Sequence, residues 1–166
     1  MFGRLLALIA GAALAVAASQ GPAFTDQYVQ NLTGRIDELA PIVEEFDAKI
    51  AHYNYTRASA MAECSTANGL LDALCSTYED LVARDEMLVA HMAELDAATI
   101  WTKPLVLAKT YKKDIATSVY GVFQPAVPAT PTGFAYGGGG FLVGYLAMSI
   151  VFGLLGGLVG GGRRYA

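Results

Sequence analysis

The chain has 166 residues, of which 54% are hydrophobic and only 16% are charged. Globular proteins carry roughly 25% charged residues, so the low charge indicates that part of the chain lies in lipid and excludes whole-chain intrinsic disorder. A net charge of -4 argues against nucleic acid as the main partner, and the presence of only two Cys and two His nearly excludes a structural zinc site.

The N-terminal segment, residues 1–23, is predicted to be a first transmembrane helix. After Arg4, the stretch from Leu5 to Ser19 carries no charge, and uncharged sequence continues to Thr25. A basic residue followed by a short apolar stretch also describes a cleavable signal peptide. The uncharged continuation extends this stretch towards the ~20 residues that cross a bilayer, which favours an uncleaved anchor.

Residues 24–122 are predicted to form an acidic, coiled-coil-like helical hairpin. Apolar residues recur at alternating steps of four and three, which is typical of one face of a helix, on both sides of a turn at residues 65–69. The two stripes are Tyr28, Leu32, Ile36, Leu39, Val43, Phe46, Ile50 and Tyr53, then Leu71, Leu74, Tyr78, Leu81, Leu88, Met92 and Leu95. We expect them to pack as an antiparallel pair.

Within this hairpin, Pro41 is expected to kink or restart the first helix, which Thr25 is expected to cap. A short helix is predicted for residues 56–64. A third helix is predicted to begin near Pro104 and to run towards Phe123, because proline is tolerated in a first helical turn.

Three polar residues of the hairpin, Asp85, His91 and His52, lie in or next to its apolar stripes. Asp85 occupies a core-type position of the second stripe. It is either a solvated residue at the flank of the stripe or a buried polar residue that fixes the register of the two helices, and we favour the first interpretation. His91 precedes the stripe residue Met92 and is expected at the surface or half-buried. A metal site at His52 or His91 would need carboxylate ligands as well, so we do not predict one.

Cys64 and Cys75 flank the predicted turn and are eleven positions apart. In an oxidising compartment such a pair is usually bridged, and a disulfide across this short loop would contribute around 2–3 kcal/mol. Two buried free thiols, or a redox-active pair, are the alternatives. A redox role is disfavoured because there is no CxxC spacing and no adjacent basic residue to stabilise a thiolate.

Residues 123–133 are predicted to be a stiff, extended linker, because three prolines fall within seven residues. It serves as a rigid spacer or as a docking strip for a partner protein; its defining residues are Phe123, Pro125, Pro128 and Pro131. Residues 134–162 are predicted to be a second, Gly-rich transmembrane helix, within a stretch that is uncharged from Thr132 to Gly162. Gly137–Gly140 is interpreted as a hinge or a site of close approach.

Basic residues set the predicted topology. Arg4 flanks the first span, and Arg163 and Arg164, in the tail 163–166, flank the second. By the positive-inside rule both termini are cytoplasmic and the central domain is periplasmic. Residues 24–131 contain eight basic and fifteen acidic side chains, a net charge of -7, although Lys103, Lys109, Lys112 and Lys113 form a basic run.

Small residues are spaced by four in both spans, which lets helix backbones approach closely in lipid. They are Ala7, Gly11, Ala15, Ser19, Gly140, Gly144, Gly153, Gly156, Gly157 and Gly160. The favoured interpretation is that the chain's own two spans pack together. Association with a partner or with a second copy is the alternative, and a pore is disfavoured because few polar residues lie in the second span.

No sequence motif for catalysis or phosphate binding occurs: GxSxG, the P-loop, GxGxxG and HExxH are all missing from the sequence. Adjacent acidic pairs such as Glu44–Glu45 point to different sides of a helix and are interpreted as a solvated face. We therefore expect no enzyme activity and no cofactor.

Two local motifs resemble a known family. Phe123-x-Pro125-Ala126-Val127-Pro128-x-Thr130-x-x-Gly133 precedes the C-terminal span, and Gln20-Gly21-Pro22-x-Phe24 is followed by Gln27-Tyr28. Together with the layout of the chain, they resemble uncharacterised proteobacterial inner-membrane proteins that share a domain of unknown function. The resemblance implies a bacterial inner-membrane location and supplies no catalytic residue or substrate.

The sequence therefore predicts an all-α membrane protein, with two transmembrane helices joined by a periplasmic helical hairpin. We expect a non-catalytic accessory or scaffold subunit that binds membrane lipid and other integral membrane proteins, a bioenergetic complex being one candidate. A homo-oligomeric channel or transport component and an envelope redox helper using Cys64 and Cys75 are the alternatives.

Overall fold

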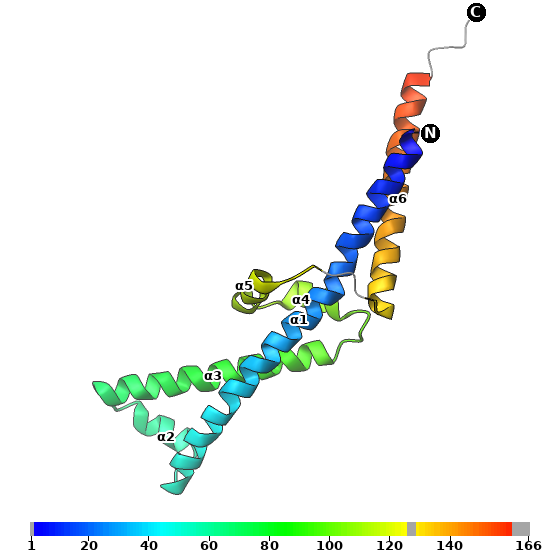
Figure 1. Cartoon of the computed structure of the whole chain (residues 1–166). Helices are drawn as coiled ribbons and strands as arrows, with labels where there is room; N and C mark the ends of the chain where they lie inside the picture. The colour runs from blue at the N-terminus through cyan, green and yellow to red at the C-terminus, as the bar shows by residue number, and fades with distance from the viewer. Residues whose placement is uncertain (1, 126–128, 161–166) are drawn as a thin grey trace, which may run out of the picture.

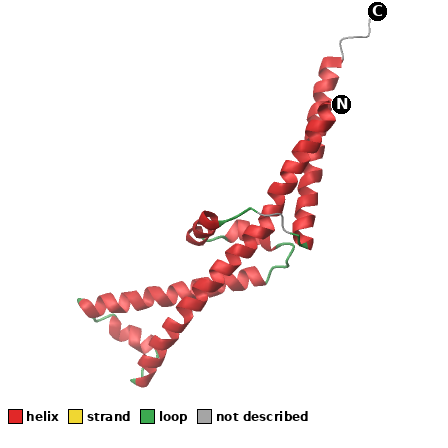
Figure 2. Ribbon diagram, in the orientation of Figure 1, coloured by secondary structure: helices red, strands yellow, loops and turns green. Residues whose placement is uncertain are grey.

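The computed structural model describes residues 2–125 and 129–160, and this part of the chain contains helices and no strands (Figures 1 and 2). Its helices are α1 (Phe2–His52), α2 (Arg57–Cys64), α3 (Leu70–Asp96), α4 (Lys103–Thr110), α5 (Lys113–Val122) and α6 (Pro131–Gly160). The predicted all-α class is confirmed. Two helices, α1 and α6, are long and apolar enough to cross a membrane.

Helix α1 is continuous past both of its prolines, so the restart expected at Pro41 and the domain boundary expected between residues 23 and 24 are not present as breaks. Pro41 lies on the exposed side, where water can bond the Asp37 carbonyl that loses its helical donor. Pro22 is buried, and α1 is packed against other helices on both sides of it. Tertiary packing therefore overrides the local preference of Pro22, and solvation allows the helix to continue through Pro41.

Thr25 is not the helix cap that the sequence suggested. It lies inside α1, where its hydroxyl donates to the Gly21 carbonyl at 2.8 Å. A buried threonine hydroxyl satisfied by the preceding turn is compatible with a continuous helix, which is why this residue gives a false start signal.

Helix α6 packs antiparallel along the N-terminal half of α1, and the start of α1 lies beside the end of α6 (Figure 1). We call these two segments the helix pair. α6 begins at Pro131 rather than at residue 134, because Thr130 caps it: Gly133 N–H donates to the Thr130 hydroxyl at 3.1 Å, and Phe134 N–H to its carbonyl at 2.9 Å. The predicted linker therefore ends three residues early. Gly137–Gly140 is helical, without a hinge.

The second half of α1, α2 and α3 form an arm that extends away from the helix pair (Figure 1). α3 runs antiparallel to α1 and crosses it, and the two helices diverge towards the far end, where α2 fills the angle between them. The core lies at the crossing and consists of Tyr28, Leu32, Leu39, Val43, Leu88, Leu95, Leu107, Ile115 and Val119. The predicted antiparallel packing of the two stripes therefore holds at the crossing only.

The distal ends of both stripes are exposed, contrary to the prediction. Phe46 and Tyr53 on α1 are 42% and 73% exposed, and Leu71 and Leu74 on α3 are both 58% exposed. The physical reason is the crossing angle: two straight helices that cross at an angle separate with distance from the crossing, and α2 is too short to cover both.

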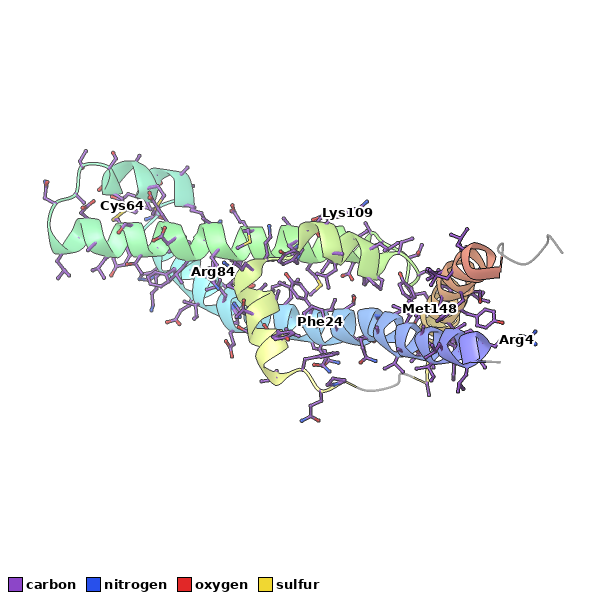
Figure 3. All side chains as sticks on the ribbon, turned by 90° about the horizontal axis from the view of Figure 1, so that it is seen from above. Arg4, Phe24, Cys64, Arg84, Lys109 and Met148 are labelled. Atoms are coloured by element: carbon purple, nitrogen blue, oxygen red, sulfur yellow. A yellow bond between two sulfur atoms is a disulfide. The ribbon has the colours of Figure 1, made fainter. Side chains whose placement is uncertain are left out.

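The single helix predicted from Pro104 to Phe123 is two helices. α4 ends at Thr110, α5 begins at Lys113, and the extended residues Tyr111 and Lys112 separate them. Lys112 N–H donates to the Tyr28 hydroxyl at 2.8 Å, so a tertiary hydrogen bond replaces a helical one. No proline or glycine marks this break in the sequence. Figure 3 shows the molecule from above, and in this view α4 and α5 lie above the part of the arm that is nearest to the helix pair.

Candidate functional site

Helix α1 and helix α6 approach closely at three glycines. A β-carbon placed on Gly140 would lie 2.5 Å from the Leu14 carbonyl oxygen and 2.6 Å from the Ala18 β-carbon. One placed on Gly144 would lie 2.9 Å from the Ala10 carbonyl oxygen, and one on Gly11 would lie 3.0 Å from the Phe141 ring. A β-carbon on Gly140 or Gly144 would lie closer to its neighbours than side chains tolerate, so glycine is needed at these two positions for the backbones to meet. Gly11 is packed tightly against Phe141.

The other small residues of the predicted rows divide into three groups. Ala7 and Ser19 are buried and Ala15 is half-buried, and the Ser19 hydroxyl donates to the Val16 carbonyl at 2.8 Å. Gly153 has open space around it. Gly156, Gly157 and Gly160 belong to α6, but their packing lies outside the described part of the structure, as do the topology residues Arg163 and Arg164. Arg4 is exposed near the start of α1.

The linker residues connect the arm to the helix pair. The Phe123 ring meets the Phe24 ring edge to face at a centroid distance of 5.5 Å, Pro125 is exposed, and Pro131 starts α6. Pro128 lies outside the described residues. Phe123 therefore fixes one end of the linker to α1.

A hydrogen-bonded group lies in the core where the arm meets the helix pair. His91 is buried, which corrects the expected surface position, and its Nε2 lies 2.9 Å from the Tyr28 hydroxyl. The sequence carried a signal for this burial: His91 lies three residues after Leu88 and four before Leu95, on the same helical face. Since the Tyr28 hydroxyl accepts from Lys112 N–H, it is free to donate its own proton to Nε2.

This arrangement assigns the neutral His91 ring a proton on Nδ1. That nitrogen faces the Glu94 carboxylate at 3.6 Å and has no hydrogen-bond partner within the described chain. Burial lowers the pKa of His91, with the positive charge of Lys112 acting in the same direction, against the opposing effect of Glu94. Burial also raises the pKa of Tyr28. Both groups are therefore held neutral, in structural roles.

Two charged groups hold the arm together at its surface. Near the crossing, Arg35 on α1 binds Asp114 on α5 at 2.9 Å, and Arg84 on α3 binds the same carboxylate at 3.2 Å. Burial acts to raise the pKa of Asp114, but the Ile115 backbone N–H and the two guanidinium groups outweigh it, and the pKa is lowered. Asp114 therefore connects three helices as a carboxylate.

Further out, Asp47 on α1 is bound through both carboxylate oxygens by Arg57 on α2. It also accepts the Tyr78 hydroxyl of α3 at 2.5 Å. The hydrogen bonds from Arg57 and then Tyr78 lower the pKa of Asp47. Asp85 is half-buried rather than solvated, and its Oδ1 is buried without a hydrogen-bond partner in the described residues.

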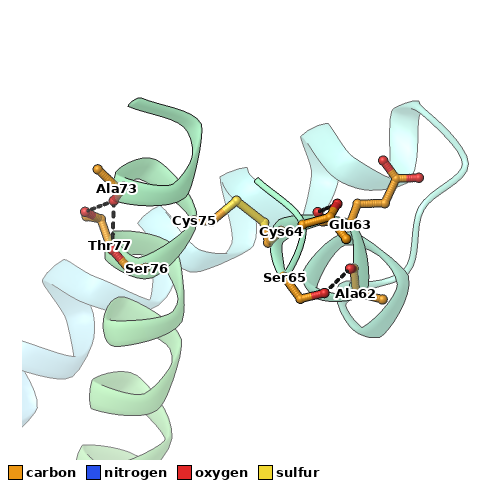
Figure 4. Close-up of a disulfide and its surroundings, with 9 residues drawn as sticks. Ala62, Glu63, Cys64, Ser65, Ala73, Cys75, Ser76 and Thr77 are labelled. Carbon is orange, nitrogen blue, oxygen red and sulfur yellow. Dashed lines mark hydrogen bonds between the residues drawn. A yellow bond between two sulfur atoms is a disulfide. The ribbon is translucent and has the colours of Figure 1, made fainter. Parts of the chain in front are cut away.

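We call the far end of the arm the distal tip and define it as residues 50–75. Cys64, at the end of α2, and Cys75, on α3, are joined by a disulfide with a Cα–Cα distance of 5.7 Å, as their spacing predicts (Figure 4). Hydroxyl groups beside the bridge bond helix carbonyls: Ser65 to Ala62 at 2.7 Å, and Thr77 to Ala73 at 2.8 Å. The disulfide therefore joins the end of α2 covalently to a helical part of α3.

The distal tip carries an open hollow of about 420 Å³ between α1, α2 and α3, lined by Ile50, Tyr53, Tyr55, Ala60, Glu63, Cys64, Thr66, Ala67, Leu71 and Cys75. Leu70 beside it is 77% exposed. The sequence stripes named several of these residues, but as core. In the described residues no group of three or more His, Cys, Asp or Glu could hold a metal ion. The tip can offer apolar contact area to a partner.

A family model described as "Protein of unknown function (DUF2937)" matches residues 2–160, nearly the whole chain. No curated protein and no solved structure matches the chain.

Proposed function

The chain belongs to the DUF2937 family of proteins of unknown function, and we propose that it is a non-catalytic accessory or scaffold subunit of a larger membrane complex. The helix pair crosses the bacterial inner membrane with both termini in the cytoplasm, and the arm stands in the periplasm. The distal tip contacts the periplasmic face of another membrane protein of the complex.

The exposed apolar residues of the distal tip carry this proposal. Leu70, Leu71, Leu74 and Tyr53 are between 58% and 77% exposed, at the end of the arm farthest from the helix pair. Large apolar side chains exposed to this degree are disfavoured in water, and gathered in one region they are typical of sites of protein–protein contact. The Cys64–Cys75 disulfide fixes the shape of that surface, which lowers the entropy lost on binding.

The helix pair supports a membrane location. Large apolar side chains on α6 face away from α1, among them Leu142, Val143, Leu146, Ile150 and Leu154. Their neighbours in the protein leave them largely uncovered, which supports an apolar lipid environment around α6. The glycines Gly11, Gly140 and Gly144 already serve the contact between α1 and α6, which leaves the arm as the better-suited surface for a partner.

The two alternative functions have less support. A homo-oligomeric channel would use the glycine face of α6, and α1 occupies that face around Gly140 and Gly144. An envelope redox helper would use the Cys64–Cys75 pair, but the basic side chain of α2, Arg57, binds the Asp47 carboxylate instead.

Purification of the tagged full-length chain from native membranes in mild detergent, with mass spectrometry of co-purifying proteins, tests the proposal. We expect a partner at a fixed ratio that is lost in the double variant Leu71→Asp and Leu74→Asp. Both side chains are 58% exposed, and aspartate is favoured at position 71 in the first turn of α3, so the fold should survive. Val89→Asp, at another exposed apolar position of α3, is the matched control and should keep the partner. A homo-oligomer without a companion, or a partner retained by the double variant, contradicts the proposal.

A further inference from the structure

Residues 97–113, which follow α3 and include α4, differ in charge from the rest of residues 24–131. This segment contains Lys103, Lys109, Lys112 and Lys113 and not one acidic residue. The remainder of residues 24–131 holds four basic and fifteen acidic side chains. Lys103 pairs with Asp96 at 2.9 Å, whereas exposed Lys109 and Lys113 have no ion pair in the described part of the protein. The segment is therefore a local cationic surface on an acidic protein.

In the structure this segment lies against the start of α6 and against the part of α1 around Pro22 and Thr25. The Tyr136 hydroxyl, in the second turn of α6, donates to the Trp101 carbonyl at 2.7 Å. A cavity of about 320 Å³ joins the same region to α1, and its lining includes Pro22, Thr25, Ile100 and Pro104. Trp101 therefore lies at the level where α6 begins.

The side chains at this level suit a bilayer surface better than water. Ile100 is 64% exposed, Trp101 47% and Leu105 57%, beside the lysines of the same segment. Tryptophan is enriched at membrane–water interfaces, and lysine can place its apolar stem along the apolar region while its ammonium group reaches phosphate. Lysine side chains are attracted to an anionic membrane surface when they lie within about one Debye length of it.

We propose that residues 97–113 form an interfacial shelf that binds the anionic phospholipid surface of the leaflet facing the arm, with Ile100 and Trp101 in the head-group region and Lys109 and Lys113 on lipid phosphates. This inference rests on the proposed membrane crossing of the helix pair. The shelf fixes how deeply the protein sits and the direction in which the arm leaves the bilayer.

Trp101 is the only tryptophan in the sequence, so its fluorescence reports on the shelf alone. The full-length chain is reconstituted in vesicles of phosphatidylcholine and phosphatidylglycerol, with phosphatidylcholine brominated either near the head group or near the chain ends. We expect strong quenching by the shallow bromines and weaker quenching by the deep ones. Unquenched emission with both lipids would overturn the shelf.

Two further variants carry a single tryptophan at another position, each combined with Trp101→Phe. They distinguish failure of the shelf from failure of the membrane crossing. Leu146→Trp, on the outward face of α6, should be quenched most by the deep bromines, and Tyr53→Trp, at the distal tip, should not be quenched. If Leu146→Trp is quenched but Trp101 is not, the shelf is wrong and the membrane crossing stands. If Leu146→Trp is also unquenched, the membrane crossing itself fails.

The lysine contribution is tested in the same vesicles. The fraction of brominated phosphatidylcholine is held constant while phosphatidylglycerol replaces unbrominated phosphatidylcholine. This replacement should increase shallow quenching of Trp101, and the double variant Lys109→Gln and Lys113→Gln should lose that dependence. Lys49→Gln, on the distal part of α1, is the control and should keep it. A dependence that persists in the double variant, or that the unaltered protein lacks, overturns the assignment of the lysines to lipid phosphates.

Discussion

At the scale of single residues, the glycines of α6 are not equivalent. Gly140 faces α1 so closely that an added methyl group would overlap the Leu14 carbonyl and Ala18, whereas neighbouring Gly139 has open space. Alanine at either position gains up to about 1 kcal/mol in helix propensity. Only at Gly140 does the methyl group force the two helices apart, which costs about 1–3 kcal/mol.

We therefore expect Gly140→Ala to lower the free energy of unfolding of the full-length protein, and Gly139→Ala to leave it equal or slightly higher. Unfolding in SDS titrations from mild detergent, followed by circular dichroism, measures both variants. Equal effects of the two substitutions would contradict the packing of α6 on α1 described above.

The buried His91 ring makes stability depend on pH in a predictable direction. Burial lowers its pKa below the unfolded value of about 6.5, so the unfolded chain binds a proton more readily than the folded one. The stabilising contribution is present above that unfolded value and is lost as pH falls through it towards the folded pKa. The loss is therefore expected to begin as the pH falls from about 7 to below 6.5.

Replacement of the ring tests this. His91→Gln should lower the free energy of unfolding at pH 7, because the Tyr28 hydroxyl loses its partner, and should flatten the dependence on pH in this range. His52→Gln, at an exposed position, is the control and should keep the slope. Thermal unfolding in mild detergent across the pH range gives both quantities. A slope unchanged in His91→Gln would assign the pH dependence to other groups.

At the scale of single elements, α2 depends on its attachments. It has no buried residue, and Thr56 and Ser59 form a capping box at its start, while Arg57 and the disulfide attach it to the rest of the arm. The double variant Cys64→Ser and Cys75→Ser should therefore expose α2 to hydrogen exchange and lower stability by around 2–3 kcal/mol. The α3 segment around Leu88 to Leu95 should stay protected. Unchanged protection of α2 would contradict this account.

Local signals predicted α2 and its turn well. Thr56 begins the helix, Gly69 adopts a left-handed φ of +64°, and the two cysteines meet across the turn. The division of the third helix at Tyr111 and Lys112 could not be predicted, because the hydrogen bond that replaces the helical one comes from Tyr28, 84 positions away. The same holds for Pro22, where long-range packing outweighs a local helix-breaking residue.

At the scale of the whole molecule, the stripes on α1 and α3 identified a surface correctly but assigned its distal end to the core. Periodicity gives the face of a helix and not the angle at which two helices cross, so the exposure of Phe46, Tyr53 and Leu71 became visible only in the folded chain. The proposed shelf has a sequence signal: the single tryptophan stands in a lysine-rich segment without acidic residues, within an acidic domain.

Helix α1 joins the two parts of the molecule without a break. Because α1 passes unbroken from the helix pair into the arm, the direction of the arm is fixed relative to the helix pair, and the distal tip is held at a set distance from it. A subunit that positions a partner needs this property, and a flexible joint at Pro22 or Pro41 would remove it.

The most direct test is a distance measurement along α1 by pulsed electron paramagnetic resonance. Genetically encoded spin labels are placed at exposed positions 12 and 44 of the full-length protein in lipid nanodiscs, with the native disulfide left intact. At 1.5 Å per residue, a continuous helix predicts a narrow distribution centred at about 48 Å. A broad distribution, or a centre well below that value, would show a joint at the prolines and contradict the fixed arm.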